Sequence, residues 1–164
     1  MITTIKIPEE RVSVLIGTRG STKRKIQRRT TTKISISGGD VTMEGDAIDV
    51  LDAENMVKAI GRGFSPENAI LLLNEENTLS IIDLPKGESA QKRIKSRLIG
   101  TNGKSRRNLE RLTGTRISVY GKTVSLIGKY DNVDLAEQAI NKLIKGVSHR
   151  FVYEFLEAKQ DERA

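Results

Sequence analysis

Two short glycine motifs constrain the fold of this chain more than any other feature of its sequence. The pentapeptide IGTRG occupies residues 16–20, and IGTNG occupies residues 99–103. The likeness extends further, because residues 16–45 align without a gap with residues 99–128, and about 13 of the 30 positions are identical. The two copies begin 83 residues apart, well above the roughly 20–50 residues of solenoid repeats. The 164 residues are therefore predicted to hold two copies of one small domain.

Each copy has the same predicted order of strands and helices. Alternating β-branched segments such as KISIS predict strands, and segments with apolar residues at helical spacing predict helices. In the first copy we expect Ser21 to cap the helix after the motif and Gly61 to end the last helix from the C′ position, just beyond it. Both copies then read β-α-α-β-β-α, an α+β fold. The expected strands are 3–7, 33–37, 41–44, 78–82, 116–120 and 123–127, and the expected helices are 12–16, 21–30, 46–60, 104–113, 133–144 and one that ends near Ile99.

The positive charge of the chain is concentrated around the two motifs. The formal net charge is +7 and the isoelectric point is about 9.7, above the value of about 9 that often accompanies nucleic-acid binding. Residues 11–39 contain eight basic residues and no acidic one, and residues 92–122 contain ten basic residues and one acid, Glu110. Residues 40–54, between them, carry six acids and no base. A run of charge is commonly a solvated helix face, but two runs at matching places in a repeat favour an anionic partner.

The order of features in both copies resembles the KH domain. These features are an apolar turn, the motif Ile-Gly-x-x-Gly, a basic helix and an Ile-x-Ile strand, and the resemblance covers nearly the whole chain. It implies two tandem KH domains of type I, each with a three-stranded antiparallel sheet packed on helices. It also implies binding of single-stranded nucleic acid, since a KH domain clamps about four nucleotides with its GxxG loop. Glycine lets the backbone approach a phosphate, and the N-terminus of the next helix attracts the anion.

The resemblance places the RNA-binding residues in the two loops, on the helices after them and along an apolar groove. Basic side chains would contact phosphates and the groove would hold bases. The expected RNA-binding residues of the first copy are Ile16, Gly17, Thr18, Arg19, Gly20, Lys23, Arg24, Ile34 and Ile36. Those of the second copy are Ile99, Gly100, Thr101, Asn102, Gly103, Lys104, Arg106, Arg107, Ile117 and Val119. Alternate strand residues share a face, so we expect the strand positions to divide between core and groove.

One position departs from the usual KH pattern in both copies. Three residues after the second glycine, KH domains usually carry an aliphatic residue, and this sequence carries Lys23 and Arg106. The next inward position is aliphatic in both copies, Ile26 and Leu109, so the helices can still pack. The groove rim is therefore expected to be more basic than usual.

Two KH domains in a small basic chain resemble a narrower family of small-subunit ribosome assembly factors. This family is called partner of Nob, or KRR, in eukaryotes and has archaeal relatives, and the segment RGFSPENAILLL (62–73) resembles it particularly. The intact glycine pair in both loops favours the archaeal branch. The resemblance implies single-stranded RNA near the 3′ end of small-subunit rRNA as the partner. The implied protein partners are a Nob-type endonuclease, an rRNA dimethylase and a translation initiation factor.

The expected division of the chain has four segments: 1–62 for the first KH domain, 63–77 for a short helical junction, 78–147 for the second KH domain and 148–164 for a C-terminal helix and tail. Ser65 and Pro66 are expected to start the junction helix, whose apolar residues would be buried between the domains. The C-terminal helix is expected to pack across both domains, with docking to another protein as the alternative. Its apolar stripe consists of Phe151, Val152, Phe155 and Leu156.

Several other classes of protein fit the sequence poorly. The chain has no cysteine, no Walker loop and no cluster of histidine with carboxylates, so we expect no catalytic activity, metal or cofactor. The acids between Asp46 and Glu54 fit an exposed helix face better than metal-assisted nuclease chemistry. We find no signal peptide or membrane span and expect a cytoplasmic protein. Two alternatives stay open, a KH-type regulator of mRNA or translation and a protein-docking scaffold for a processing nuclease or initiation factor.

Overall fold

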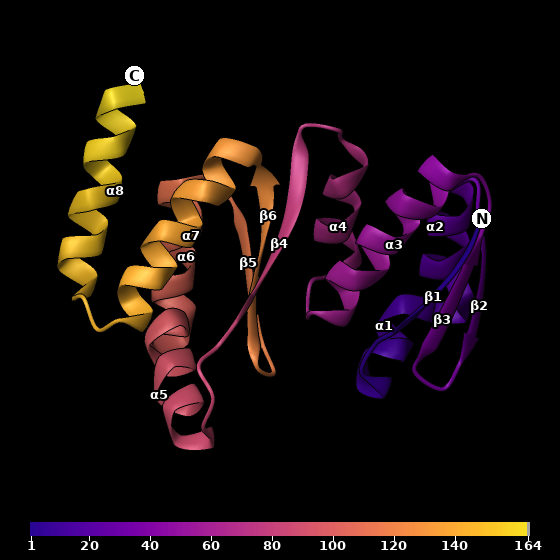
Figure 1. Cartoon of the computed structure of the whole chain (residues 1–164), viewed down its shortest axis with the longest axis horizontal. Helices are drawn as coiled ribbons and strands as arrows, with labels where there is room; N and C mark the ends of the chain where they lie inside the picture. Colours follow the sequence, from indigo (N-terminus) through magenta and orange to yellow (C-terminus); the bar gives the residue numbers. More distant parts are fainter. Residues whose placement is uncertain (164) are drawn as a thin grey trace. The chain divides into compact units, whose positions relative to one another are not determined.

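The computed structural model describes residues 1–163, which form two compact units (Figure 1). The first unit is Met1–Glu75, and the second begins at Glu76. Each unit contains a three-stranded antiparallel sheet with helices packed on it. The predicted α+β fold and its β-α-α-β-β-α order are therefore confirmed in both units.

The first unit has its strands in the order β1-β3-β2. Ile34 lies opposite Met43 in the pairing of β2 with β3, and both side chains are buried. The alternate residues of the same strands face away from the core, as the alternation in KISIS predicts. The elements are β1 (Ile2–Lys6), η1 (Glu9–Arg11), α1 (Val12–Ile16), η2 (Thr18–Gly20), α2 (Ser21–Thr30), β2 (Lys33–Ser37), β3 (Asp40–Glu44), α3 (Ala47–Gly61), α4 (Pro66–Ala69) and η3 (Ile70–Leu73).

The second unit repeats this arrangement with strand order β4-β6-β5. Ile117 lies opposite Leu126, the same relationship that Ile34 has with Met43. The elements are β4 (Asn77–Asp83), α5 (Glu88–Ile99), η4 (Thr101–Gly103), α6 (Lys104–Thr113), β5 (Arg116–Tyr120), β6 (Thr123–Lys129), α7 (Tyr130–Ile144) and α8 (His149–Arg163).

Gly61 does end its helix, but the C′ position expected for it is wrong. Gly61 is the last residue of α3 and is buried, and the left-handed backbone occurs two residues later at Gly63, with φ +97°. A Cβ atom at Gly61 would lie 2.7 Å from Cγ2 of Ile7. The glycine therefore serves close packing of α3 against the chain that leaves β1, a tertiary contact that local sequence does not reveal.

The expected capping role of Ser21 is also wrong. Ser21 is the first residue of α2, and the cap position is Gly20, which has φ +76°. Glycine adopts this conformation without strain, so the loop turns directly into the helix. As a result, the first turn of α2 receives no hydrogen bond from a capping side chain within the described residues.

The junction helix begins as expected. The Oγ atom of Ser65 accepts a hydrogen bond of 3.2 Å from the backbone N–H of Asn68, and Pro66 occupies the first turn. Both α4 and η3 pack on α3, and Ala69 and Leu72 are buried. The segment after the first KH domain therefore belongs to the first compact unit.

The C-terminal helix α8 packs on α6 and α7, so part of its apolar stripe is buried within the second unit. Val152 and Leu156 lie in the core of that unit, Phe155 packs against this core, and Phe151 is 66% exposed. The start of α8 follows the start of α4 by 83 residues, the same interval that separates the two motifs. The duplication therefore includes the helix after α3 and α7, which is short in the first unit and long in the second.

Candidate nucleic-acid interface

The two glycine loops have nearly identical backbones. The first glycine has φ +74° at Gly17 and +72° at Gly100. The residue before the last glycine is left-handed in both loops, with φ +54° at Arg19 and at Asn102. Each loop joins two helices, α1 to α2 in the first unit and α5 to α6 in the second. The sequence repeat is therefore also a repeat of loop geometry.

Close packing explains why each motif starts with glycine. A Cβ atom at Gly17 would lie 2.8 Å from the backbone nitrogen of Thr22, and one at Gly100 would lie 2.8 Å from the backbone nitrogen of Ser105. Real Cβ atoms essentially never approach other atoms so closely. The absent side chain therefore lets the loop fold back on the first turn of the following helix.

The N-termini of α2 and α6 are suited to binding an anion. Each helix has ten residues, starts directly after its loop and, within residues 1–163, has no side chain that caps its first turn. The first N–H groups of a helix lack intrahelical partners and carry partial positive charge. A phosphate placed against either loop would meet these groups and the basic side chains that follow them.

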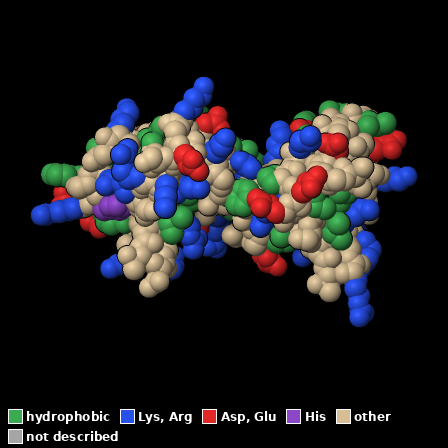
Figure 2. Space-filling view, turned by 90° about the horizontal axis from the view of Figure 1, so that it is seen from below, with side chains coloured by type: hydrophobic (Ala, Val, Ile, Leu, Met, Phe, Trp, Pro, Cys, Tyr) green, Lys and Arg blue, Asp and Glu red, His purple; other side chains and the backbone are tan. Residues whose placement is uncertain are grey.

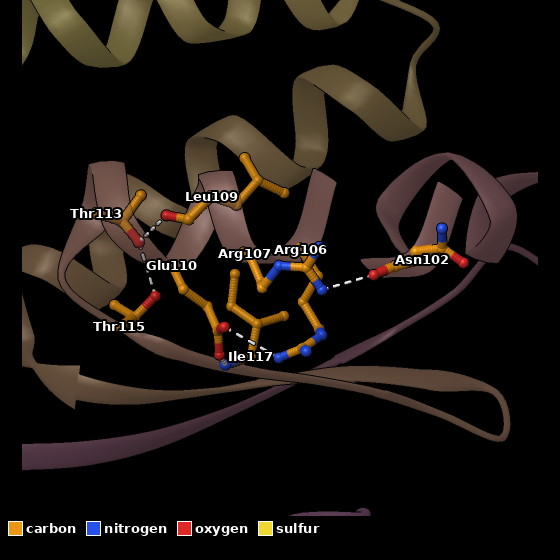
Figure 3. A network of polar contacts seen from close by, with 8 residues as sticks. All are labelled: Asn102, Arg106, Arg107, Leu109, Glu110, Thr113, Thr115 and Ile117. Carbon is orange, nitrogen blue, oxygen red and sulfur yellow. Dashed lines mark hydrogen bonds and ion pairs between the residues drawn. The ribbon is translucent and has the colours of Figure 1, made fainter. Parts of the chain in front are cut away.

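An arginine spans each loop. Nη1 of Arg24 donates a hydrogen bond to the carbonyl oxygen of Arg19, and Nη1 of Arg107 donates one to that of Asn102 (Figure 3). Both arginines are exposed, and each guanidinium group has further donors. These two predicted RNA-binding residues therefore have a second role, which is to hold the loop carbonyl.

A pair of residues that the sequence analysis missed fixes the helix after each loop to the neighbouring strand. Oε1 of Gln27 accepts a hydrogen bond of 2.8 Å from the N–H of Ile34, and Oε2 of Glu110 accepts one of 2.9 Å from the N–H of Ile117 (Figure 3). Gln27 and Glu110 are aligned in the repeat. The alignment of the two copies could have revealed this pair, because Gln and Glu have side chains of equal length that both end in an acceptor oxygen.

Arg106 and Lys23, the two basic departures from the KH pattern, have different surroundings. Nη1 of Arg106 forms a 2.9 Å ion pair with Oε1 of Glu110, one helical turn further on. The residue one turn after Lys23 is Gln27, which is neutral. The charge of Arg106 is therefore balanced by Glu110, whereas Lys23 has no carboxylate at the corresponding place.

The predicted groove residues divide between core and surface. Ile34 is 2% exposed and Ile117 is 5% exposed, so both belong to the core. The half-buried apolar positions are Ile16, Ile36, Ile99 and Val119. Thr18, Arg19, Thr101, Asn102 and Lys104 are exposed, and the four loop glycines are half-buried. A base beside either loop would therefore contact the half-buried set, while Ile34 and Ile117 support it from below.

One acidic residue of α3, Asp52, has a perturbed pKa. Burial raises the pKa of Asp52, and the nearby carboxylates of Asp49 and Glu75 raise it further. Among the described residues, no group of three His, Cys, Asp or Glu side chains could hold a metal ion. No helix within residues 1–163 is long and apolar enough to cross a membrane.

The topology and both loops define a protein with two type I KH domains. The family described as eukaryotic type KH domain, type I, second domain of PNO1, matches residues 77–161, and the KH domain family matches residues 2–59. A KH domain-containing protein of Methanocaldococcus jannaschii is 41% identical over 96% of this chain and 74% of its own length. The chain belongs to the Dim2/PNO1 family of KH-domain proteins.

Relatives with known names and structures give the same assignment. The pre-rRNA-processing protein PNO1 of Chaetomium thermophilum is 28% identical over 74% of this chain, which spans about half of that protein's length (48%). The crystal structure of Dim2p from Pyrococcus horikoshii matches with a TM-score of 0.90 at 41% identity, covering 96% of this chain and 99% of that one. A complex of a/eIF2alpha, aDim2p and rRNA from the same organism matches with a TM-score of 0.92 at 40% identity, covering 99% and 95%.

Proposed function

We propose that this chain is a non-catalytic protein that binds single-stranded RNA, and that its RNA is the 3′ end of small-subunit rRNA during subunit maturation. The observation that carries the proposal is the pair of GxxG loops with matching backbone angles, each followed by a basic helix whose first turn receives no side-chain cap within the described residues. This combination suits a phosphate backbone better than a small-molecule substrate.

Each predicted site residue has a role in this proposal. The four loop glycines with Thr18, Arg19, Thr101 and Asn102 approach the phosphates, and Lys23, Arg24, Lys104, Arg106 and Arg107 supply positive charge. Phosphate contacts give affinity without sequence preference. Base preference then depends on the half-buried apolar side chains Ile16, Ile36, Ile99 and Val119, with Ile34 and Ile117 as their support.

The names of the relatives support the choice of RNA and partners. The Chaetomium relative is named as a pre-rRNA-processing protein, and the Pyrococcus complex contains rRNA together with a/eIF2alpha. We extend these properties to this chain and propose that it holds unpaired rRNA for a Nob-type endonuclease and an rRNA dimethylase, and that it also binds a translation initiation factor.

A second candidate function is a protein-docking scaffold. The observation that favours it is the exposed surface of α3, where Ile48 is 75% exposed and Leu51 is 51% exposed next to acidic side chains. Large apolar side chains at such exposure are typical of contact surfaces when they are grouped. This function is compatible with RNA binding by the loops, but it would not require the loops.

The proposal is tested by fluorescence anisotropy with a single-stranded RNA copied from the 3′ end of small-subunit rRNA. The variants are Thr18→Asp/Arg19→Asp and Thr101→Asp/Asn102→Asp, which place carboxylates where phosphates would lie. We expect at least one variant to lose binding by tenfold or more while its circular dichroism spectrum is unchanged. A scrambled RNA of equal length measures specificity. Unchanged binding by both folded variants would favour the scaffold function.

A further inference from the structure

The second unit has a basic hollow apart from its glycine loop. The hollow has a volume of about 930 Å³ and lies where β4 ends, α5 begins and the turn between β5 and β6 comes close. Four lysines line it, Lys86, Lys92, Lys95 and Lys122, together with the carboxylates of Asp83 and Glu88. We call this set the lysine hollow. Its excess of cations favours an anionic occupant.

Helix α5 links the lysine hollow to the proposed RNA groove, because its first turns line the hollow and its last residue is Ile99. Lys92, Lys95 and Ile99 are spaced three and four residues apart on α5, so they share one face of the helix. Ile99 is a groove residue, and Gly100 starts the glycine loop directly after it. At a rise of about 1.5 Å per residue, Lys92 lies about 12 Å from Gly100 along the helix axis. A strand held at the loop would therefore reach the hollow after a short extension.

The first unit has the opposite charge at the corresponding place. A hollow of about 540 Å³ lies between the end of β1 and the turn between β2 and β3, and the charged residues that line it are Lys6, Glu9 and Asp40. The 83-residue interval pairs Glu9 with Lys92 and Val12 with Lys95. The basic character is therefore a property of the second unit and does not follow from the fold that both units share.

The four lysines are available to a ligand. Among the described residues, none of them forms an ion pair with a carboxylate, whereas Lys58, Lys129 and Lys159 do. Asp83 and Glu88, the two acids of the hollow, also form no ion pair in the described part of the chain. Figure 2 shows Lys and Arg side chains gathered over the second unit, in the left half of the view.

We propose that the lysine hollow binds phosphates of the RNA strand beyond the nucleotides held by the second glycine loop. This inference rests on the proposed function, because it extends the same RNA. The expected contact is with the sugar-phosphate backbone, since lysine is a flexible point charge and does not offer the planar fork that reads a base edge. The second unit would thus hold a longer strand than the first.

The test compares a short RNA with a long one. The short RNA has about four nucleotides, the length that a KH domain clamps, and the long RNA has about twelve, extended on both sides of the same core. The variant is Lys92→Gln/Lys95→Gln, and both lysines lie on the part of α5 that lines the hollow. The control is Lys145→Gln/Arg150→Gln, which removes two positive charges from exposed positions just after α7 and at the start of α8.

We expect the variant to bind the short RNA as the wild type does and to bind the long RNA roughly tenfold more weakly at low salt. Its plot of log affinity against log salt for the long RNA should be shallower by about 1.4, since each single-strand phosphate contact contributes about 0.7. The control should match the wild type on both RNAs.

Three results separate this inference from the proposed function. If the long RNA binds the variant and the wild type equally, or if the variant loses the same factor on both RNAs, the lysine hollow does not hold the extended strand. A third binding partner is an acidic peptide with the same net charge as the long RNA. If the peptide binds the wild type but not the variant, and both proteins bind RNA equally, the hollow serves a protein partner and the inference is wrong. If the short RNA binds independently of both Thr18→Asp/Arg19→Asp and Thr101→Asp/Asn102→Asp, the proposed function itself fails.

Discussion

Glu110 Oε2 accepts a 2.9 Å hydrogen bond from the backbone N–H of Ile117 and so ties the helix after the second glycine loop to strand β5. The other carboxylate oxygen, Oε1, pairs with Arg106 at 2.9 Å. One side chain therefore connects the sheet, the helix and a basic residue of the proposed RNA surface. Gln27 makes the first of these contacts in the first unit but carries no charge for the second.

Replacing Glu110 separates its structural role from its charge. Glu110→Ala leaves the N–H of Ile117 without its acceptor, and we expect the free energy of unfolding to fall by about 1–3 kcal/mol. Glu110→Gln keeps an acceptor, as Gln27 does, and should lose less than about 1 kcal/mol because the ion pair is partly exposed. Urea denaturation measures both. Equal losses for the two variants would mean that the hydrogen bond to Ile117 contributes little.

The same substitution should strengthen RNA binding. Glu110→Gln releases Arg106 from its ion pair and leaves its guanidinium free for a phosphate, so we expect affinity for single-stranded RNA to rise about two- to fivefold at low salt. The measurement is anisotropy, and the control is Glu157→Gln, which makes the same change in net charge on the exposed surface of α8. An equal gain in the control would assign the effect to net charge alone.

The left-handed residue of each loop gives a third prediction. Arg19 and Asn102 have the same φ of +54°, but asparagine adopts this conformation more readily than arginine. Arg19→Asn should therefore raise the free energy of unfolding by about 0.5–1 kcal/mol, and Asn102→Arg should lower it by a similar amount. Thermal denaturation measures the pair. Changes of the same sign in both variants would show that backbone strain does not decide the outcome.

The raised pKa of Asp52 predicts a dependence of stability on pH. Burial is the larger cause, and Asp49 and Glu75 add to it. Because the folded state holds the proton more tightly than the unfolded state, stability contributed by protonated Asp52 is lost as the pH rises from 3.8 through the folded pKa. Asp52→Asn should thus be more stable than wild type at pH 7, with a difference that shrinks on acidification. Denaturation between pH 3 and pH 7 measures this, with Asp161→Asn as an exposed control. A difference that grows on acidification would contradict the sign.

The sequence predicted the architecture well because each helix and strand of the repeat occurs in two copies, whose patterns could be compared. The helices at 21–30 and 104–113 and the strands at 33–37 and 116–120 have the expected bounds, since alternation and the glycine loops mark their ends locally. The position of Gly61 was predicted wrongly because a glycine is needed there for packing against the side chain of Ile7, 54 residues away in sequence. Ser21 was misread because a left-handed Gly20 occupies the cap position in its place.

The candidate site could be predicted as a set of residues but not as a set of roles. The resemblance to the KH domain placed both Ile34 and Ile36 in the groove, and only packing separates the buried Ile34 from the half-buried Ile36. The contacts of Arg24 and Arg107 with the loop carbonyls depend on the left-handed backbone, which sequence alone does not give. The burial of Val152 and Leu156, where α8 packs on α6 and α7, likewise depends on the tertiary fold.

The most direct measurement is an NMR titration of the ¹⁵N-labelled chain with single-stranded RNA copied from the 3′ end of small-subunit rRNA. If the glycine loops bind the strand, the largest amide shifts will occur at Gly17–Gly20 or Gly100–Gly103 and in the first turn of α2 or α6, because those N–H groups would meet the phosphates. Shifts confined to α3 around Ile48 and Leu51, with both loops unchanged, would contradict RNA binding by the loops.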